Sequence, residues 1–109
     1  YPERRELVVN AGALALSRDP GPIHVDPGCG FGAVVDAVRQ RPIPGLKVVS
    51  LSQEHGVLRR DRPLDPSWQP GTRFRILPNH SCLAAACFDR FHVVRGPEIV
   101  DEWRPVRGW

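Results

Sequence analysis

An all-β fold, mostly strand with one short helix, is predicted for this chain of 109 residues. Three observations favour it. Short apolar or alternating runs recur along the chain, 12 prolines and 10 glycines are spread between them, and one segment alone has strong helical propensity. Six to eight short strands separated by Gly/Pro turns are typical of a Greek-key-like β-barrel or sandwich. The length fits a single domain over residues 1–109.

The first part of the chain alternates between short runs and turns. Three strands are expected, starting at Val8 and covering 23–26 and 33–36. Between them, Gly12 marks a close approach of the backbone, and residues 14–17 are expected to be extended or in a turn. Prolines flanking a glycine make 18–22 a loop. The glycine-rich segment 27–32 lacks the order of a phosphate-binding motif, which favours a tight turn over a nucleotide site.

The second part of the chain contains the clearest elements. Strands are expected over 46–51, from Val57 to Leu58, over 73–77, and as a hairpin of 91–95 with 98–104. The segment 52–56 forms a polar elbow before Val57, and 62–71 is a proline-rich loop. Three consecutive alanines predict one or two helical turns starting near Ser81 or Cys82, with Ser81 as the N-cap.

The composition of the chain argues against two classes of partner, membranes and nucleic acids, and indicates the state of its cysteines. No run of 18 apolar residues is present, so no membrane span is expected. The net charge is +3, and acidic residues are interspersed with the basic ones, so no nucleic-acid-binding stripe is expected. Three cysteines, an odd number, favour cytoplasmic thiols over a disulfide framework. Because the chain starts at Tyr1 and contains no methionine, we expect it to be part of a longer protein.

A histidine and a cysteine two positions apart give the strongest chemical signal. His80 and Cys82 follow the alternating strand 73–77, and they would lie on one face if the backbone stays extended. Zinc accepts both imidazole nitrogen and thiolate sulfur, so the pair predicts two ligands of a metal site. The alternative is a capping segment in which Cys82 is buried and inert.

A second polar cluster lies on the elbow before Val57. Glu54 and His55 could take part in acid–base chemistry or orient a partner. The alternative is a turn in which Gly56 takes a positive φ and both side chains face water.

Three motifs in order carry a resemblance to a known family. They are residues 10–17 (NAGALALS), 52–56 (SQEHG) and 78–82 (PNHSC). Together they resemble the C-terminal domain of the D-serine dehydratase / D-threonine aldolase family, fold-type III pyridoxal-phosphate enzymes related to alanine racemase. The resemblance covers nearly the whole chain, to residues 107–109.

The resemblance implies that two domains supply different parts of the active site. An N-terminal (β/α)₈ barrel, absent from this chain, would carry pyridoxal 5'-phosphate on a lysine. The β-domain would bring Zn²⁺ or another divalent metal on His80 and Cys82, and His55 would line the same cleft as a catalytic or substrate-contacting residue. Lys47, the single lysine, lies in an apolar strand without a phosphate loop, so this chain alone is expected to bind no pyridoxal phosphate and to be inactive.

The resemblance also implies a reaction. Cys82 favours dehydration of D-serine or another β-hydroxy-D-amino acid, because the aldolase branch carries aspartate at that position. The expected partners are the barrel domain, the substrate and, in the full-length enzyme, a second subunit of a homodimer. A D-threonine aldolase-type retro-aldol lyase and a non-catalytic, free-standing β-barrel module remain the alternatives.

Overall fold

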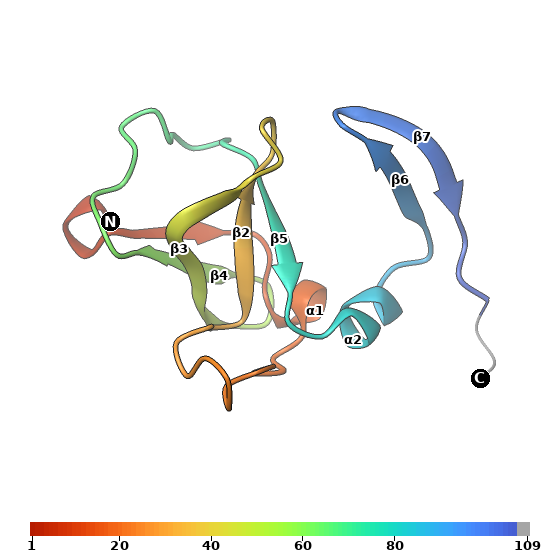
Figure 1. The fold of residues 1–109 in the computed structure, drawn as a ribbon, viewed down its shortest axis with the longest axis horizontal. Helices are drawn as coiled ribbons and strands as arrows, with labels where there is room; N and C mark the ends of the chain where they lie inside the picture. The colour runs from red at the N-terminus through yellow and green to blue at the C-terminus, as the bar shows by residue number, and fades with distance from the viewer. Residues whose placement is uncertain (107–109) are drawn as a thin grey trace.

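The computed structural model describes residues 1–106, arranged in two antiparallel sheets (Figure 1). The larger sheet has the strand order β1-β4-β3-β2-β5, and β6 pairs with β7 in the smaller one. The strands are β1 (Glu6–Val9), β2 (Gly32–Asp36), β3 (Pro42–Leu51), β4 (Gly56–Arg60), β5 (Phe74–Pro78), β6 (Phe91–Arg95) and β7 (Glu98–Trp103). The short helices are η1 (Pro2–Arg4), α1 (Ala13–Leu16) and α2 (Ser81–Ala86).

The predicted all-β class is confirmed by this architecture. Seven strands lie within the described residues, inside the predicted range of six to eight. Over the same residues the larger sheet is open, because β1 and β5 form its two edges, so the closed barrel is not formed. Residues 107–109, where the predicted resemblance ends, lie outside the described residues.

The core lies on one face of the larger sheet, where its three central strands meet. Val48 of β3 and Leu58 of β4 are fully buried, and Val34 of β2 is 1% exposed. Alternate residues of β4 are the most buried, as expected for a strand with one covered face. The ladder between β3 and β4 changes register between Val48 and Ser50, which marks a bulge in the long strand β3.

Two local predictions in the first part of the chain are wrong. In the segment 14–17, expected to be extended or in a turn, residues 14–16 belong to α1 and Ser17 is its C-cap; Leu16 packs into the core. Alanine and leucine are strong helix formers, so the local propensity was available in the sequence. The segment 23–26 is not a strand, because the Val25 and Asp26 N–H groups bond back to Pro22 in a turn.

The hairpin of β6 and β7 is confirmed, and it projects away from the larger sheet beyond α2 (Figure 1). Every residue of β7 is exposed, including Ile99 and Trp103.

Among residues 1–106, no helix has the length and apolar character needed to cross a membrane.

Candidate metal centre

His80 and Cys82 lie where β5 runs into α2. His80 has an extended backbone (φ −126°, ψ 102°) and is the N-cap of α2, and Cys82 lies in the first turn of that helix. The predicted geometry is therefore wrong, because the backbone is extended at His80 but already helical at Cys82. The prediction of Ser81 as N-cap is also wrong, since Ser81 is the first helical residue and no side chain caps the helix.

The two side chains interact despite this change of backbone. His80 is half-buried, and Cys82 is exposed. The Asp19 carboxylate and, after it, the Cys82 side chain raise the pKa of His80 above its ordinary value of 6.5. The thiol therefore lies within interaction range of the imidazole. The alternative of a buried Cys82 is wrong, because the side chain is exposed.

Asp19 is the closest partner of His80. Its Oδ2 lies 2.6 Å from His80 Nδ1, although 61 positions separate the two residues. The interaction with His80, together with the Gly21 N–H, lowers the pKa of Asp19 below 3.8. At neutral pH the carboxylate is thus charged and faces the imidazole.

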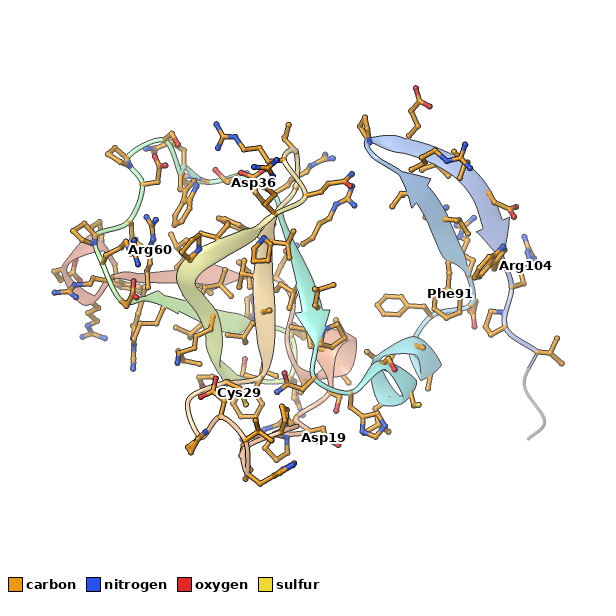
Figure 2. All side chains as sticks on the ribbon, in the orientation of Figure 1. Asp19, Cys29, Asp36, Arg60, Phe91 and Arg104 are labelled. Atoms are coloured by element: carbon orange, nitrogen blue, oxygen red, sulfur yellow. The ribbon has the colours of Figure 1, made fainter. Side chains whose placement is uncertain are left out.

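Hydrogen bonds hold Asp19 in place. Its N–H donates to Ser17 Oγ (3.0 Å), and its Oδ1 accepts from the Gly21 N–H (2.8 Å). Asn79, next to His80, donates through Nδ2 to the carbonyls of Pro20 (3.2 Å) and Gly30 (2.7 Å). The loop that carries Asp19 and the junction that carries His80 are therefore fastened to each other. Figure 2 shows Asp19 on this loop, at the end of the molecule where β5 meets α2.

No local pattern in the sequence indicates the pairing of Asp19 with His80. The Asp-Pro-Gly run at 19–21 is typical of a turn in which the aspartate accepts a backbone N–H, and that local contact is present. A contact across 61 positions depends on the way α1 and α2 pack, which no local pattern encodes.

The three motifs of the resemblance meet in space. A Cβ on Gly12 would lie 2.4 Å from the Gln53 carbonyl oxygen, so the 10–17 segment packs directly on the 52–55 turn. The N–H of Ala13 donates to the Ser52 carbonyl (2.8 Å), which ties the start of α1 to the same turn. At its other end α1 contacts α2, which follows His80.

His55 is exposed and is the last residue of the 52–55 turn. Its N–H donates to Ser52 Oγ (3.3 Å), and its side chain lines a cavity of about 790 Å³ together with Val9, Thr72 and Phe74. Neither His80 nor Cys82 lines that cavity. The predicted positive φ at Gly56 is wrong; a glycine fits there because a Cβ would lie 2.6 Å from the Ala11 carbonyl oxygen.

The donor set suits a metal but is incomplete by itself. One imidazole and one thiol match the ligands of zinc, and Asp19 on Nδ1 leaves Nε2 available. Within residues 1–106, no group of three or more His, Cys, Asp or Glu side chains is placed to hold an ion. The described part of the chain therefore offers two ligands, and further positions would be open to water, substrate or other protein groups.

Fold and site together define a mainly β domain that presents an imidazole and a thiol at one end of its sheet. The chain belongs to the "Putative serine dehydratase domain" family, which it matches over residues 1–94. The predicted resemblance to the C-terminal domain of this family is confirmed.

Two of the curated relatives are dehydratases of D-amino acids. The chain is 39% identical to the D-serine dehydratase of Dictyostelium discoideum over 116 residues, covering 100% of this chain and 28% of that protein. It is 35% identical to the D-threo-3-hydroxyaspartate dehydratase of Delftia sp. (strain HT23), covering 94% of this chain and 28% of that protein. The chain thus spans between a quarter and a third of the length of these relatives.

The solved structure of the Delftia enzyme has the same fold. It matches with a TM-score of 0.84 at 33% identity, over 100% of this chain and 30% of that one. A variant of that enzyme, with a cysteine replaced by alanine and in a metal-free form, matches with a TM-score of 0.83 at 32% identity. The match covers 100% of this chain and 30% of that one. In another variant, alanine replaces a histidine two positions before that cysteine. This structure matches with a TM-score of 0.84 at 32% identity, over 99% of this chain and 29% of that one.

Proposed function

We propose that the protein is a dehydratase of β-hydroxy-D-amino acids in which this domain holds a divalent metal ion on His80 and Cys82. The observation that carries the proposal is the placement of an exposed thiol in the first turn of α2, two residues after the His80 imidazole at the junction of β5 and α2. Membership of the serine dehydratase domain family supplies the reaction class. The two curated relatives act on D-serine and D-threo-3-hydroxyaspartate, so the proposed substrate class includes both.

The solved relatives support the choice of ligands. In the Delftia enzyme the cysteine variant was obtained metal-free, and the other variant replaces a histidine two positions earlier. His80 and Cys82 have this spacing and this order. A nitrogen and a sulfur donor favour zinc, although other divalent ions bind such sites.

The proposed chemistry assigns distinct tasks to the residues of this chain. When bound, a divalent metal polarises an oxygen ligand, which would assist departure of the substrate β-hydroxyl. His80 and Cys82 would supply two ligands to the ion, and the described residues supply no third His, Cys, Asp or Glu ligand beside them. Asp19 fixes the orientation of the imidazole. His55 lines a cavity that neither His80 nor Cys82 lines, so we assign it a contact with the substrate or with the other domain.

A second, larger domain is part of the proposal. The chain spans 28% of the relatives' length, and we place pyridoxal 5'-phosphate on a (β/α)₈ barrel in the remainder. Lys47, the single lysine of this chain, bonds through Nζ to the Gly28 carbonyl, which supports a cofactor lysine elsewhere. A homodimeric full-length enzyme in the cytoplasm, where the three free cysteines stay reduced, completes the proposal.

The test is a product analysis on the full-length protein, reconstituted with pyridoxal phosphate and zinc. We expect ammonia and a 2-oxo acid from D-serine or D-threo-3-hydroxyaspartate, and neither product from L-serine. Replacement of His80 by alanine or Cys82 by serine should lower the rate at least 100-fold. Cys87→Ala, at the exposed end of the same helix, is the matched control and should keep it.

The alternatives give different products. A retro-aldol lyase would release glycine and acetaldehyde from D-threonine without ammonia. A non-catalytic module would give no product with any of these substrates. Either result would contradict the proposed dehydration.

A further inference from the structure

We propose that Asp19 is a positioning residue for the metal centre, which sets the tautomer and the ring orientation of His80. This inference rests on the proposed function, since it assumes that His80 is a metal ligand. The contact of Asp19 Oδ2 with His80 Nδ1, at 2.6 Å, is a short hydrogen bond between two half-buried side chains.

The contact determines which imidazole nitrogen is free. A carboxylate can only accept a hydrogen bond, so in the neutral imidazole the proton resides on Nδ1 and points at Asp19. The lone pair of the neutral ring is then on Nε2. Metal-binding histidines commonly bond through their second ring nitrogen to a carboxylate, which fixes the ring and makes the ligand nitrogen more basic.

Asp19 is itself held rigidly enough for this task. One carboxylate oxygen accepts from Gly21 while the other faces His80, so the carboxylate cannot rotate without losing a hydrogen bond. Asn79 adds two hydrogen bonds that fasten the Asp19 loop and the 30–31 turn to the residue before His80. The imidazole is thus fixed from its backbone side and from its Nδ1 side.

The matched control is another aspartate of the same region. Asp26 Oδ1 accepts the Gly28 N–H at 2.8 Å, the same kind of turn contact that Asp19 makes with Gly21. Within residues 1–106, the carboxylate that bonds to the His80 imidazole is that of Asp19, not that of Asp26. Replacing Asp26 by alanine therefore removes a comparable turn contact and leaves the His80 contact intact.

The first experiment measures zinc affinity of the purified protein by competition with a chromophoric chelator. We expect Asp19→Ala to weaken zinc binding by about 10- to 100-fold, the range seen when carboxylate partners of metal-binding histidines are removed. Asp19→Asn keeps an oxygen that can accept from Nδ1 and should lose less. Asp26→Ala should bind as the wild type does. Equal affinity of Asp19→Ala and the wild type would overturn the inference.

The second experiment does not depend on a variant that folds. Long-range ¹H–¹⁵N NMR correlations of the metal-free wild-type protein report which nitrogen of neutral His80 carries the proton. We expect the Nδ1–H form, and a dominant Nε2–H form would overturn the inference.

The zinc affinity of His80→Ala distinguishes failure of the proposed function from failure of the positioning role. If it binds zinc as the wild type does, the proposed function fails; if it loses zinc while Asp19→Ala does not, the positioning role alone fails.

Discussion

Replacing Gly21 by alanine should disturb the link between the Asp19 loop and His80. Gly21 has a φ of +61°, and a Cβ built on it would lie 2.6 Å from Asn79 Cβ and 2.8 Å from Asn79 Cγ. The substitution therefore combines backbone strain with a clash against the side chain that fastens the loop to the junction. Asn79 would have to move away from the carbonyls of Pro20 and Gly30.

The expected loss of stability follows from these two effects. A non-glycine residue in the left-handed region costs about 1–2 kcal/mol. Each of the two Asn79 hydrogen bonds contributes about 0.5–1.5 kcal/mol. The unfolding free energy should thus fall by about 2–5 kcal/mol in total.

Gly96→Ala is the matched control. Gly96 has nearly the same φ, +62°, but no atom lies within 4 Å of a Cβ built there. Urea unfolding should show a loss of about 1–2 kcal/mol for this variant. Gly21→Ala should also weaken zinc binding, because His80 follows Asn79 directly. Equal losses of stability in both variants, with unchanged zinc affinity, would refute the role given to Asn79.

Three further predictions concern the core, the ion pair and the metal. Leu58→Ala removes a fully buried side chain and should cost about 2–5 kcal/mol in urea unfolding; a similar cost for Leu77→Ala, whose side chain is 59% exposed, would contradict the assigned core. The pKa of His80, followed by NMR, should lie above 6.5 in the metal-free protein and fall in Asp19→Ala. Because the pKa of His80 is raised and that of Asp19 lowered, the stability that the pair contributes should be greatest between pH 3.8 and 6.5 and decline as pH rises through the His80 pKa; a constant difference between wild type and Asp19→Ala from pH 5 to 9 would argue against the pair. Zinc at about 100 times its Kd should stabilise the protein by about 2.7 kcal/mol, and a chelator should remove that gain; a Cys82→Ser variant with the same gain would exclude the thiol.

The strands could be predicted because their signals are local. The alternation around Phe74 and the β-branched run at Val48 each mark a strand that the structure contains. The helix α1 is a single turn beside Gly12, too short to show helical periodicity even though alanine and leucine favour a helix, and its position is fixed by backbone hydrogen bonds to the 52–53 turn. Such contacts between distant segments leave no periodic pattern in the sequence.

The candidate site was predicted in part. The spacing of His80 and Cys82 indicated a shared site, but for a wrong reason, since the change from strand to helix and not a continuous strand brings the side chains into interaction. Asp19 could not be predicted, because its partner is 61 positions away. The cavity lined by His55 is formed by segments from β1 and from residues 70–74, which only the folded sheet brings together.

The central claim is that an imidazole and a thiolate of this domain bind the same ion, and X-ray absorption at the zinc edge tests it most directly. For the zinc-loaded protein we expect one sulfur at about 2.3 Å and at least one imidazole nitrogen at about 2.0–2.1 Å. The sulfur should disappear in Cys82→Ser. A zinc ion surrounded by oxygen and nitrogen alone in the wild-type protein would contradict the account.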